Sequence, residues 1–125
     1  IEERAYQTEK GLWRYGSVDE GGGEDTLWLG IGTLESYRKF CAYFGSERVI
    51  PLYLEVDAGE RLKRSFAREQ KEAVPCYAEL VRRFQADEAD YAEDKLLVAG
   101  IKKRYRNAEL GACLGELYED MLQYV

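Results

Sequence analysis

The sequence predicts an α/β protein in which helices flank a parallel sheet. Apolar runs of strand length, at residues 26–31 and 49–56, alternate with longer segments whose apolar residues recur at helical spacing. Strands that alternate with helices of ten or more residues indicate βαβ units, in which a helix connects two parallel strands. The 125 residues fit one domain.

The composition is that of a soluble globular protein and excludes several functions. The chain is 46% apolar and 34% charged, which suits a packed core beneath a solvated surface. A net charge of −6 argues against binding to nucleic acid or to anionic membranes. The lack of histidine excludes histidine acid–base chemistry and histidine-bound metals. No apolar run approaches the roughly 18 residues of a spanning helix, so no membrane partner is expected.

The cysteines predict the cellular compartment. Cys41, Cys76 and Cys113 are odd in number and far apart, so they indicate neither a disulfide framework nor a metal site. A reducing cytoplasm is therefore the expected location. The acidic residues 86–95 are interpreted as a solvated helix end and turn, and no metal ligands are assigned.

The first part of the chain predicts two short strands and a loop. Residues 1–18 alternate aromatic and polar side chains, which indicates either an aromatic hairpin packed on a core or an aromatic-lined lobe. Residues 19–25 (DEGGGED) predict a surface loop, because their acidic side chains would repel a phosphate and no lysine follows. Residues 26–31 (TLWLGI) predict a buried strand.

A helix is predicted over residues 33–44. Thr33 is its expected N-cap, and Gly45 suits the left-handed residue that follows a helix. The side chains expected to face inward are Leu34, Tyr37 and Cys41.

Residues 48–91 organise the rest of the chain. A buried strand at 49–56, with Pro51 near its start or at a bulge, leads through the turn at residues 57–59 into a helix. A second helix follows Pro75. Its expected core-facing stripe consists of Tyr77, Leu80, Val81 and Phe84.

The first of these helices carries Arg61, Arg64 and Arg68, and the second carries Arg82 and Arg83. The first three lie on one helix face, where like charges cost about 0.2–0.5 kcal/mol per pair. A bound phosphate would turn this cost into a gain, because the guanidinium fork fits phosphate oxygens. The alternative is solvated ion pairing within the helix, of Arg64 with Glu60 or of Arg68 with Glu72.

The last part of the chain predicts a strand at residues 101–106 and a closing helix. Asn107 is the expected N-cap of that helix. The helix carries an apolar stripe that indicates core packing, or a dimer face where its cover is missing. The stripe consists of Leu110, Leu114, Leu117 and Met121, widened by Cys113 and Leu122.

Several motifs in this order resemble the guanylate kinase family, and more narrowly a bacterial guanylate-kinase-like branch. After the predicted strand come RLKRSFAR (61–68), YAELVRRF (77–84) and DEADY (87–91), which resemble the lid and the helix that follows it. The resemblance extends upstream to RAYQT (4–8) and GLWRYGS (11–17), and downstream to YRN (105–107). Nearly the whole chain is covered.

The resemblance implies a partial P-loop nucleoside-monophosphate-kinase fold. Residues 1–25 would end the monophosphate-binding lobe, and residues 26–125 would form the C-terminal part of the core domain, with a helical lid at about 58–91. The implied reaction transfers the γ-phosphoryl group of ATP to GMP, with Mg²⁺ accompanying ATP. ATP and GMP are therefore the implied partners.

The resemblance also assigns roles to individual residues. Arg68 and Arg83, together with Arg64, would contact the phosphates and carry the catalysis. The GMP side would be formed by Glu3, Tyr15, Gly16 and Ser17, and Asn107 would lie on the adenine side.

The sequence departs from the family at three positions. Ala5 stands where the glutamate that reads guanine would align best, and Gly30 and Gly32 stand where the family has an aspartate pair. These departures leave open which monophosphate is accepted.

No G-x-x-x-x-G-K-[ST] motif occurs, although guanylate kinases need this loop to hold the ATP phosphates. The chain opens at Ile1 within a motif, so we expect a truncated piece of a longer enzyme that is inactive alone and self-associates through exposed apolar surface. Two further hypotheses remain. One is a non-catalytic guanylate-kinase-like interaction domain, and the other is an unrelated α/β domain with solvated arginines.

Overall fold

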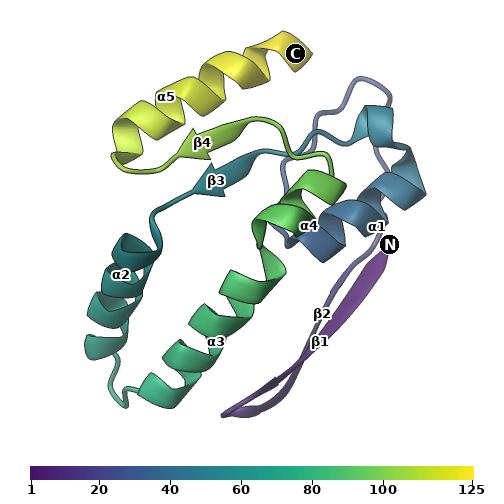
Figure 1. Ribbon diagram of the computed structural model, residues 1–125. Coiled ribbons are helices and arrows are strands. Elements are labelled where there is room, and N and C mark those ends of the chain that lie inside the picture. The colour runs from purple at the N-terminus through teal and green to yellow at the C-terminus, as the bar shows by residue number, and fades with distance from the viewer.

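The computed structural model describes all 125 residues and confirms a mixed α/β protein (Figure 1). The five helices and four strands form an antiparallel hairpin, a pair of helices, and a parallel strand pair covered by the last helix. None of the helices has the length and apolar character needed to cross a bilayer. The elements are β1 (Glu2–Thr8), β2 (Gly11–Ser17), α1 (Leu34–Phe44), β3 (Tyr53–Glu55), α2 (Ala58–Gln70), α3 (Tyr77–Asp90), α4 (Glu93–Val98), β4 (Arg104–Arg106) and α5 (Leu110–Met121).

β1 and β2 form the hairpin predicted for residues 1–18. Their register pairs Thr8 with Gly11 across a turn made by Glu9 and Lys10. Gly11 has φ 111°, a conformation that glycine adopts without a steric cost. The Thr8 hydroxyl group accepts a hydrogen bond from the Lys10 amide at 3.1 Å and donates to the Gly11 carbonyl group at 2.8 Å. These bonds fix the turn.

The strand predicted at residues 26–31 is wrong. Residues 18–33 form neither helix nor strand, and Ile31 is 102% exposed. A strand needs a neighbour to pair its backbone groups, and no segment of the chain lies beside this one as a partner. The apolar pattern alone therefore does not make it a strand.

α1 begins and ends where the sequence predicts. The Thr33 side chain accepts a hydrogen bond from the Ser36 amide at 3.2 Å, and Gly45, with φ 93°, follows the helix. Ser36 is the fully buried residue of α1, whereas Leu34, Tyr37 and Cys41 are only half-buried. The expected inward face is therefore only partly covered.

The parallel pair is shorter than predicted. Residues 46–48 form a 3₁₀ turn, and β3 spans only Tyr53–Glu55 instead of residues 49–56. Two features limit the length of β3. Pro51 has no amide hydrogen to donate to a neighbouring strand, and β4, the strand that pairs with β3, is three residues long. The Asn107 amide donates to the Glu55 carbonyl group at 2.9 Å and extends the pairing by one bond.

α2 and α3 form the two helices predicted for the lid segment. The Asp57 side chain caps α2 by accepting from the Glu60 amide at 3.2 Å. Arg61 of α2 pairs with Glu88 of α3 and lies over the Phe84 ring, 5.4 Å from its centroid. These contacts hold the two helices together.

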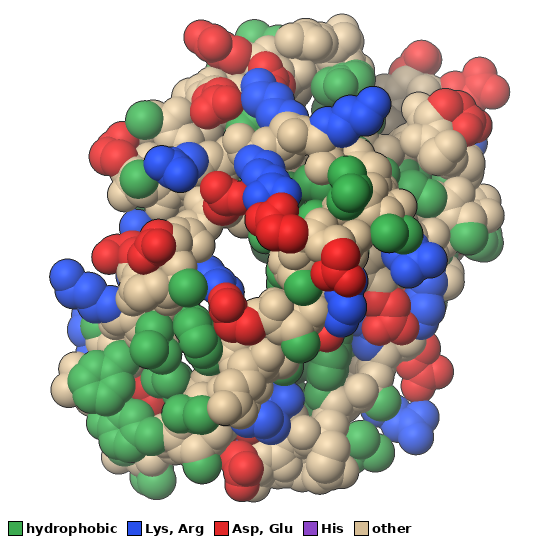
Figure 2. All heavy atoms as spheres, viewed as in Figure 1, with side chains coloured by type: hydrophobic (Ala, Val, Ile, Leu, Met, Phe, Trp, Pro, Cys, Tyr) green, Lys and Arg blue, Asp and Glu red, His purple; other side chains and the backbone are tan.

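The apolar stripe predicted for α3 is only partly buried. Leu80 is 8% exposed, but Tyr77 is 44% and Val81 is 49% exposed. They line an open apolar groove of about 450 Å³ with Leu62 and Phe66 of α2, and Figure 2 shows apolar side chains gathered over these helices.

The core is small and lies around α4, β4 and α5. The Tyr105 hydroxyl group donates to Asp120 of α5 at 2.6 Å, which fixes α5 over the strand pair. Burial and this bond raise the pKa of Tyr105 to about 12. The buried apolar residues are Leu80, Leu96, Ile101, Tyr105 and Cys113.

The predicted N-cap of α5 is wrong, and its predicted apolar stripe is only partly buried. Its N-cap is Glu109, whose carboxylate accepts from the amides of Gly111 at 2.9 Å and Ala112 at 2.6 Å, because Asn107 is still paired with β3. The stripe is not wholly in the core either, since Leu110 is 63% and Leu114 is 55% exposed. The chain exposes 9632 Å², against about 6,800 Å² for a compact monomer of this size.

We expect Leu96→Ala to lower the free energy of unfolding by about 2–4 kcal/mol, because it removes buried methyl groups and leaves a cavity. Leu96 is 1% exposed, whereas its neighbour Leu97 is 79% exposed. Leu97→Ala is therefore the matched control and should change stability by less than about 0.5 kcal/mol. Urea unfolding followed by circular dichroism measures both variants. Equal losses would show that Leu96 does not belong to the core.

Candidate functional site

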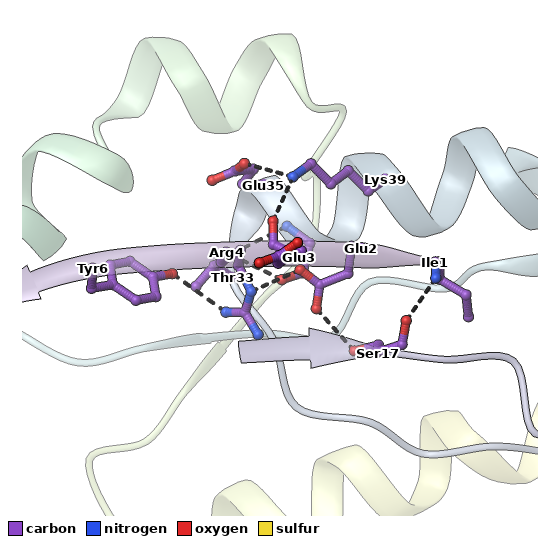
Figure 3. A network of polar contacts seen from close by, with 10 residues as sticks. Ile1, Glu2, Glu3, Arg4, Tyr6, Ser17, Thr33, Glu35 and Lys39 are labelled. Atoms are coloured by element: carbon purple, nitrogen blue, oxygen red, sulfur yellow. Dashed lines mark hydrogen bonds and ion pairs between the residues drawn. The ribbon is translucent and has the colours of Figure 1, made fainter. Parts of the chain in front are cut away.

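A buried carboxylate organises one end of the hairpin (Figure 3). Glu2 accepts from the Ser17 hydroxyl group at 2.9 Å and from Arg4 Nε at 2.8 Å, and its side chain is fully buried. Burial alone would raise the pKa of Glu2, but the hydrogen bonds from Ser17 and Arg4 outweigh it and lower the pKa. Glu2 is therefore a charged acceptor beneath Ser17.

The hairpin brings together the residues predicted for the GMP side. Its register places Glu2 opposite Ser17, Glu3 opposite Gly16, and Arg4 opposite Tyr15. Residues directly opposite each other in an antiparallel pair point to the same face. Tyr15 and Ser17 thus share a face with Glu2, whereas Glu3 lies on the other face.

Glu3 pairs on that outer face with Arg14, at 3.0 Å, and both side chains are well exposed. Glu2 is the carboxylate that the sequence interpretation missed. The two-residue period of a strand carries a signal for it, because Glu2 follows the same alternation as Arg4 and Tyr6. The pairing with Ser17 is visible only in the structure.

Aromatic and cationic groups continue the inner face of the hairpin. Arg4 lies 5.9 Å from the centroid of the Tyr15 ring, and the Tyr6 and Tyr15 rings meet edge to face at 5.8 Å. Arg4 Nη1 also donates to the Tyr6 hydroxyl group at 3.4 Å. The inner face therefore combines hydroxyl groups, rings and one buried ion pair.

A cleft of about 610 Å³ lies between this hairpin, α1 and the region where α3 gives way to α4. Small-molecule sites have volumes of roughly 300–1,000 Å³, so the cleft is large enough for a nucleotide. Lys39 pairs with Glu35 at 2.9 Å and donates to the Glu3 carbonyl group at 3.0 Å. Arg38 lines the cleft without an ion pair. The other charged lining residues are Asp90, Asp94 and Lys95.

A second group of predicted residues lies at the carboxyl end of the parallel pair. Arg64 Nη2 donates to the Ala108 carbonyl group at 3.3 Å, next to Asn107, and Arg64 Nε pairs with Glu60 at 3.0 Å. The structure thus places Arg64 near Asn107. It also shows the ion pair of Arg64 with Glu60, which was the alternative to phosphate binding. Ligands of open α/β sheets bind beyond the carboxyl ends of the strands.

The three predicted catalytic arginines bind different partners. Arg68 donates to the Ser65 hydroxyl group at 3.2 Å instead of pairing with Glu72, and Arg83 pairs with Glu79 at 3.3 Å. Arg64 faces the loop before α5. The side chain of Arg83 is 70% exposed, so most of its donors face solvent.

Glu79 is a second buried carboxylate that the sequence interpretation missed. It is 5% exposed and accepts from Arg82 Nη2 at 2.7 Å, Arg82 Nε at 2.9 Å and the Glu9 amide at 2.9 Å. Hydrogen bonding from Arg82 outweighs burial and, with the Glu9 amide and Arg83, lowers the pKa of Glu79 to about 2. Its spacing of three and four residues from two arginines is a sequence signal for these ion pairs.

No three acidic or cysteine side chains converge in a way that would hold a metal ion. No family model, curated protein or solved structure matches the chain.

We expect the contribution of Glu79 to stability to depend on pH. Its pKa of about 2 in the folded chain lies below the ordinary value of 4.5, so its stabilisation is complete above about pH 4.5 and is lost as the pH falls toward 2. Glu79→Gln should therefore destabilise the chain at pH 7 and much less at pH 2.5. Urea unfolding at both pH values measures this, with Glu72→Gln as the exposed control. A loss that is the same at both pH values would contradict the assignment.

Proposed function

We propose that the chain forms the monophosphate-binding hairpin, the helical lid and the adenine-side loop of a guanylate-kinase-like phosphotransferase. Such an enzyme transfers the γ-phosphoryl group of ATP to GMP. The observation that carries the proposal is the hairpin register, which puts Tyr15 and Ser17 on one face with Glu2 and Arg4. The same face reaches the cleft through Tyr6.

In this proposal, the hairpin holds the monophosphate. The Tyr15 hydroxyl group donates to a phosphate oxygen, and the Ser17 hydroxyl group does so once it exchanges its bond to Glu2 for one to the phosphate. Gly16 keeps the backbone accessible, since a Cβ atom there would lie 3.3 Å from the Glu2 carbonyl oxygen. Glu3, whose carboxylate is exposed on the outer face, accepts hydrogen bonds from the donor edge of guanine.

The arginines of α2 and α3 supply positive charge to the transferring phosphates when the lid closes. Phosphoryl transfer spreads negative charge over the γ-phosphoryl oxygens, and positioned guanidinium groups stabilise that charge. Arg68 and Arg83 are exposed and keep most of their donors free for this role. Asn107, beside Arg64 at the strand ends, contacts the adenine side.

These 125 residues lack a P-loop, so transfer is proposed for a longer protein that contains one. The chain alone is expected to bind GMP without phosphorylating it. Mg²⁺ would arrive with ATP.

A second candidate is a non-catalytic interaction domain of the same type. Ala5, Gly30 and Gly32 favour it, and a Cβ atom on Gly32 would lie 3.0 Å from the Ser36 Cβ atom. An aspartate at that position would therefore require Ser36 to move by a few tenths of an ångström. A coupled assay with ATP, Mg²⁺ and GMP on a protein that joins this chain to a P-loop separates the two. Turnover supports the enzyme, and silence with GMP, AMP, dGMP and UMP supports the interaction domain.

We expect Tyr15→Phe and Ser17→Ala each to weaken GMP binding about tenfold, because each removes a donor to a charged phosphate. Arg68→Ala combined with Arg83→Ala should reduce the advantage of GMP over guanosine, because it removes positive charge while Tyr15 and Ser17 remain. Isothermal titration calorimetry on the 125-residue chain measures both effects. Tyr118→Phe, an exposed tyrosine on α5, is the control. Unchanged affinity in the double arginine variant would show that α2 and α3 are not a phosphate-binding lid.

We also propose that the chain self-associates through the exposed apolar side chains of α5. Leu110, Leu114, Tyr118 and Leu122 recur every four residues along one helix face and are 52–64% exposed. Leu114→Lys should shift the chain toward a monomer in light scattering, whereas Gln123→Lys should not. A monomeric parent chain at high concentration would contradict this expectation.

A further inference from the structure

Among the three buried polar residues, Glu79 is the one that joins segments far apart in the sequence. It lies in the first turn of α3, where a negative charge is favoured by the helix dipole. Its hydrogen bond from the Glu9 amide spans 70 residues and connects the hairpin turn to the helical pair. No other hydrogen bond connects the hairpin to α2 or α3. The hydrogen bond from Lys39 to the Glu3 carbonyl group connects the hairpin to α1.

The two oxygens of Glu79 face different partners. Oε2 accepts from the Glu9 amide and from Arg82 Nε, both at 2.9 Å. Oε1 accepts from Arg82 Nη2 at 2.7 Å and from Arg83 Nε at 3.3 Å. One oxygen is therefore bound to the hairpin, and the other orients Arg83.

Arg82 and Arg83 use this carboxylate differently. Arg82 binds both oxygens, and its side chain is 30% exposed, so it neutralises the buried charge. Arg83 donates a single bond and is 70% exposed, so its remaining donors can bind an anion while Glu79 fixes the direction of the guanidinium group.

We propose that Glu79 is a positioning residue that couples the monophosphate-binding hairpin to Arg83. The proposed ligand contacts at Tyr15 and Ser17 lie at the end of the hairpin opposite the turn, so a movement must pass along the paired strands to reach the Glu9 amide. The carboxylate that accepts from this amide also holds Arg83. This inference rests on the proposed function only for the identity of the ligand, which is GMP. The coupling itself follows from the shared carboxylate.

The turn offers a substitution that removes only the hairpin contact. Glu9 follows Thr8 and precedes Lys10 and Gly11, and only Gly11 of these has a positive φ. This pattern fits a type I turn with Glu9 at its second position, where proline is favoured. Glu9→Pro deletes the amide hydrogen and leaves Glu79 and Arg83 in place. Glu9→Ala keeps the amide hydrogen and is the matched control.

The test follows the Arg83 Nε–H resonance by NMR in the 125-residue chain as GMP is added. In the parent chain and in Glu9→Ala, GMP should shift this resonance. In Glu9→Pro, GMP should still bind but the shift should be lost. A full shift in Glu9→Pro would overturn the coupling, because Arg83 would then respond without the hairpin contact.

A ligand-free measurement separates this inference from the proposed function. If the parent chain binds no GMP, the proposed function fails, but the Arg83 Nε–H resonance should still differ between Glu9→Pro and Glu9→Ala. Identical resonances in these two variants would overturn the coupling whatever the ligand. Glu79→Gln provides a second test of the coupling. Glutamine has one carbonyl oxygen and cannot accept at both positions that the two carboxylate oxygens occupy. The proposal would also be contradicted if, in that variant, the Glu9 amide stayed protected from hydrogen exchange and GMP still shifted the Arg83 Nε–H resonance.

Discussion

Polar contacts between distant segments, more than an apolar core, hold the parts of this chain in place. Only five apolar residues are buried, so each junction between elements depends on a charged or hydroxyl group. Glu79 joins the hairpin to α3, Arg104 joins β4 to β3 and α4 through Glu55 and Glu93, and Asp120 joins α5 to β4 through Tyr105. Because Glu79 is buried and Arg104, Glu55 and Asp120 are only partly exposed, removing a partner leaves these charges uncompensated.

Local signals in the sequence predicted most of the helices. Thr33 and Gly45 mark the ends of α1, and Asp57, the first residue of the predicted turn, caps α2, because capping depends on residues close in the chain. The strands were predicted less well, because a strand depends on a distant partner. Residues 26–31 have strand composition but no partner, and residues 49–56 pair only as far as the three residues of β4 allow.

The candidate site was predicted in part for the same reason. The sequence identifies Tyr15, Gly16 and Ser17, but the register decides which glutamate shares a face with Tyr15 and Ser17, and that residue is Glu2. Asn107 looked like a helix cap, yet its amide belongs to the strand pair. Glu79 lies within the motif YAELVRRF, which the sequence interpretation used only for its arginines. The fold alone brings the Glu9 amide to Glu79.

The irregular segment between β2 and α1 has a consequence for how the molecule could be divided. Residues 18–32 are exposed, so a protease can reach them, whereas the hairpin before them is held by side-chain contacts from α1 and α3. A cut within this segment would break the chain without breaking those contacts. The hairpin and the remainder are thus suited to reassociation as two separate polypeptides.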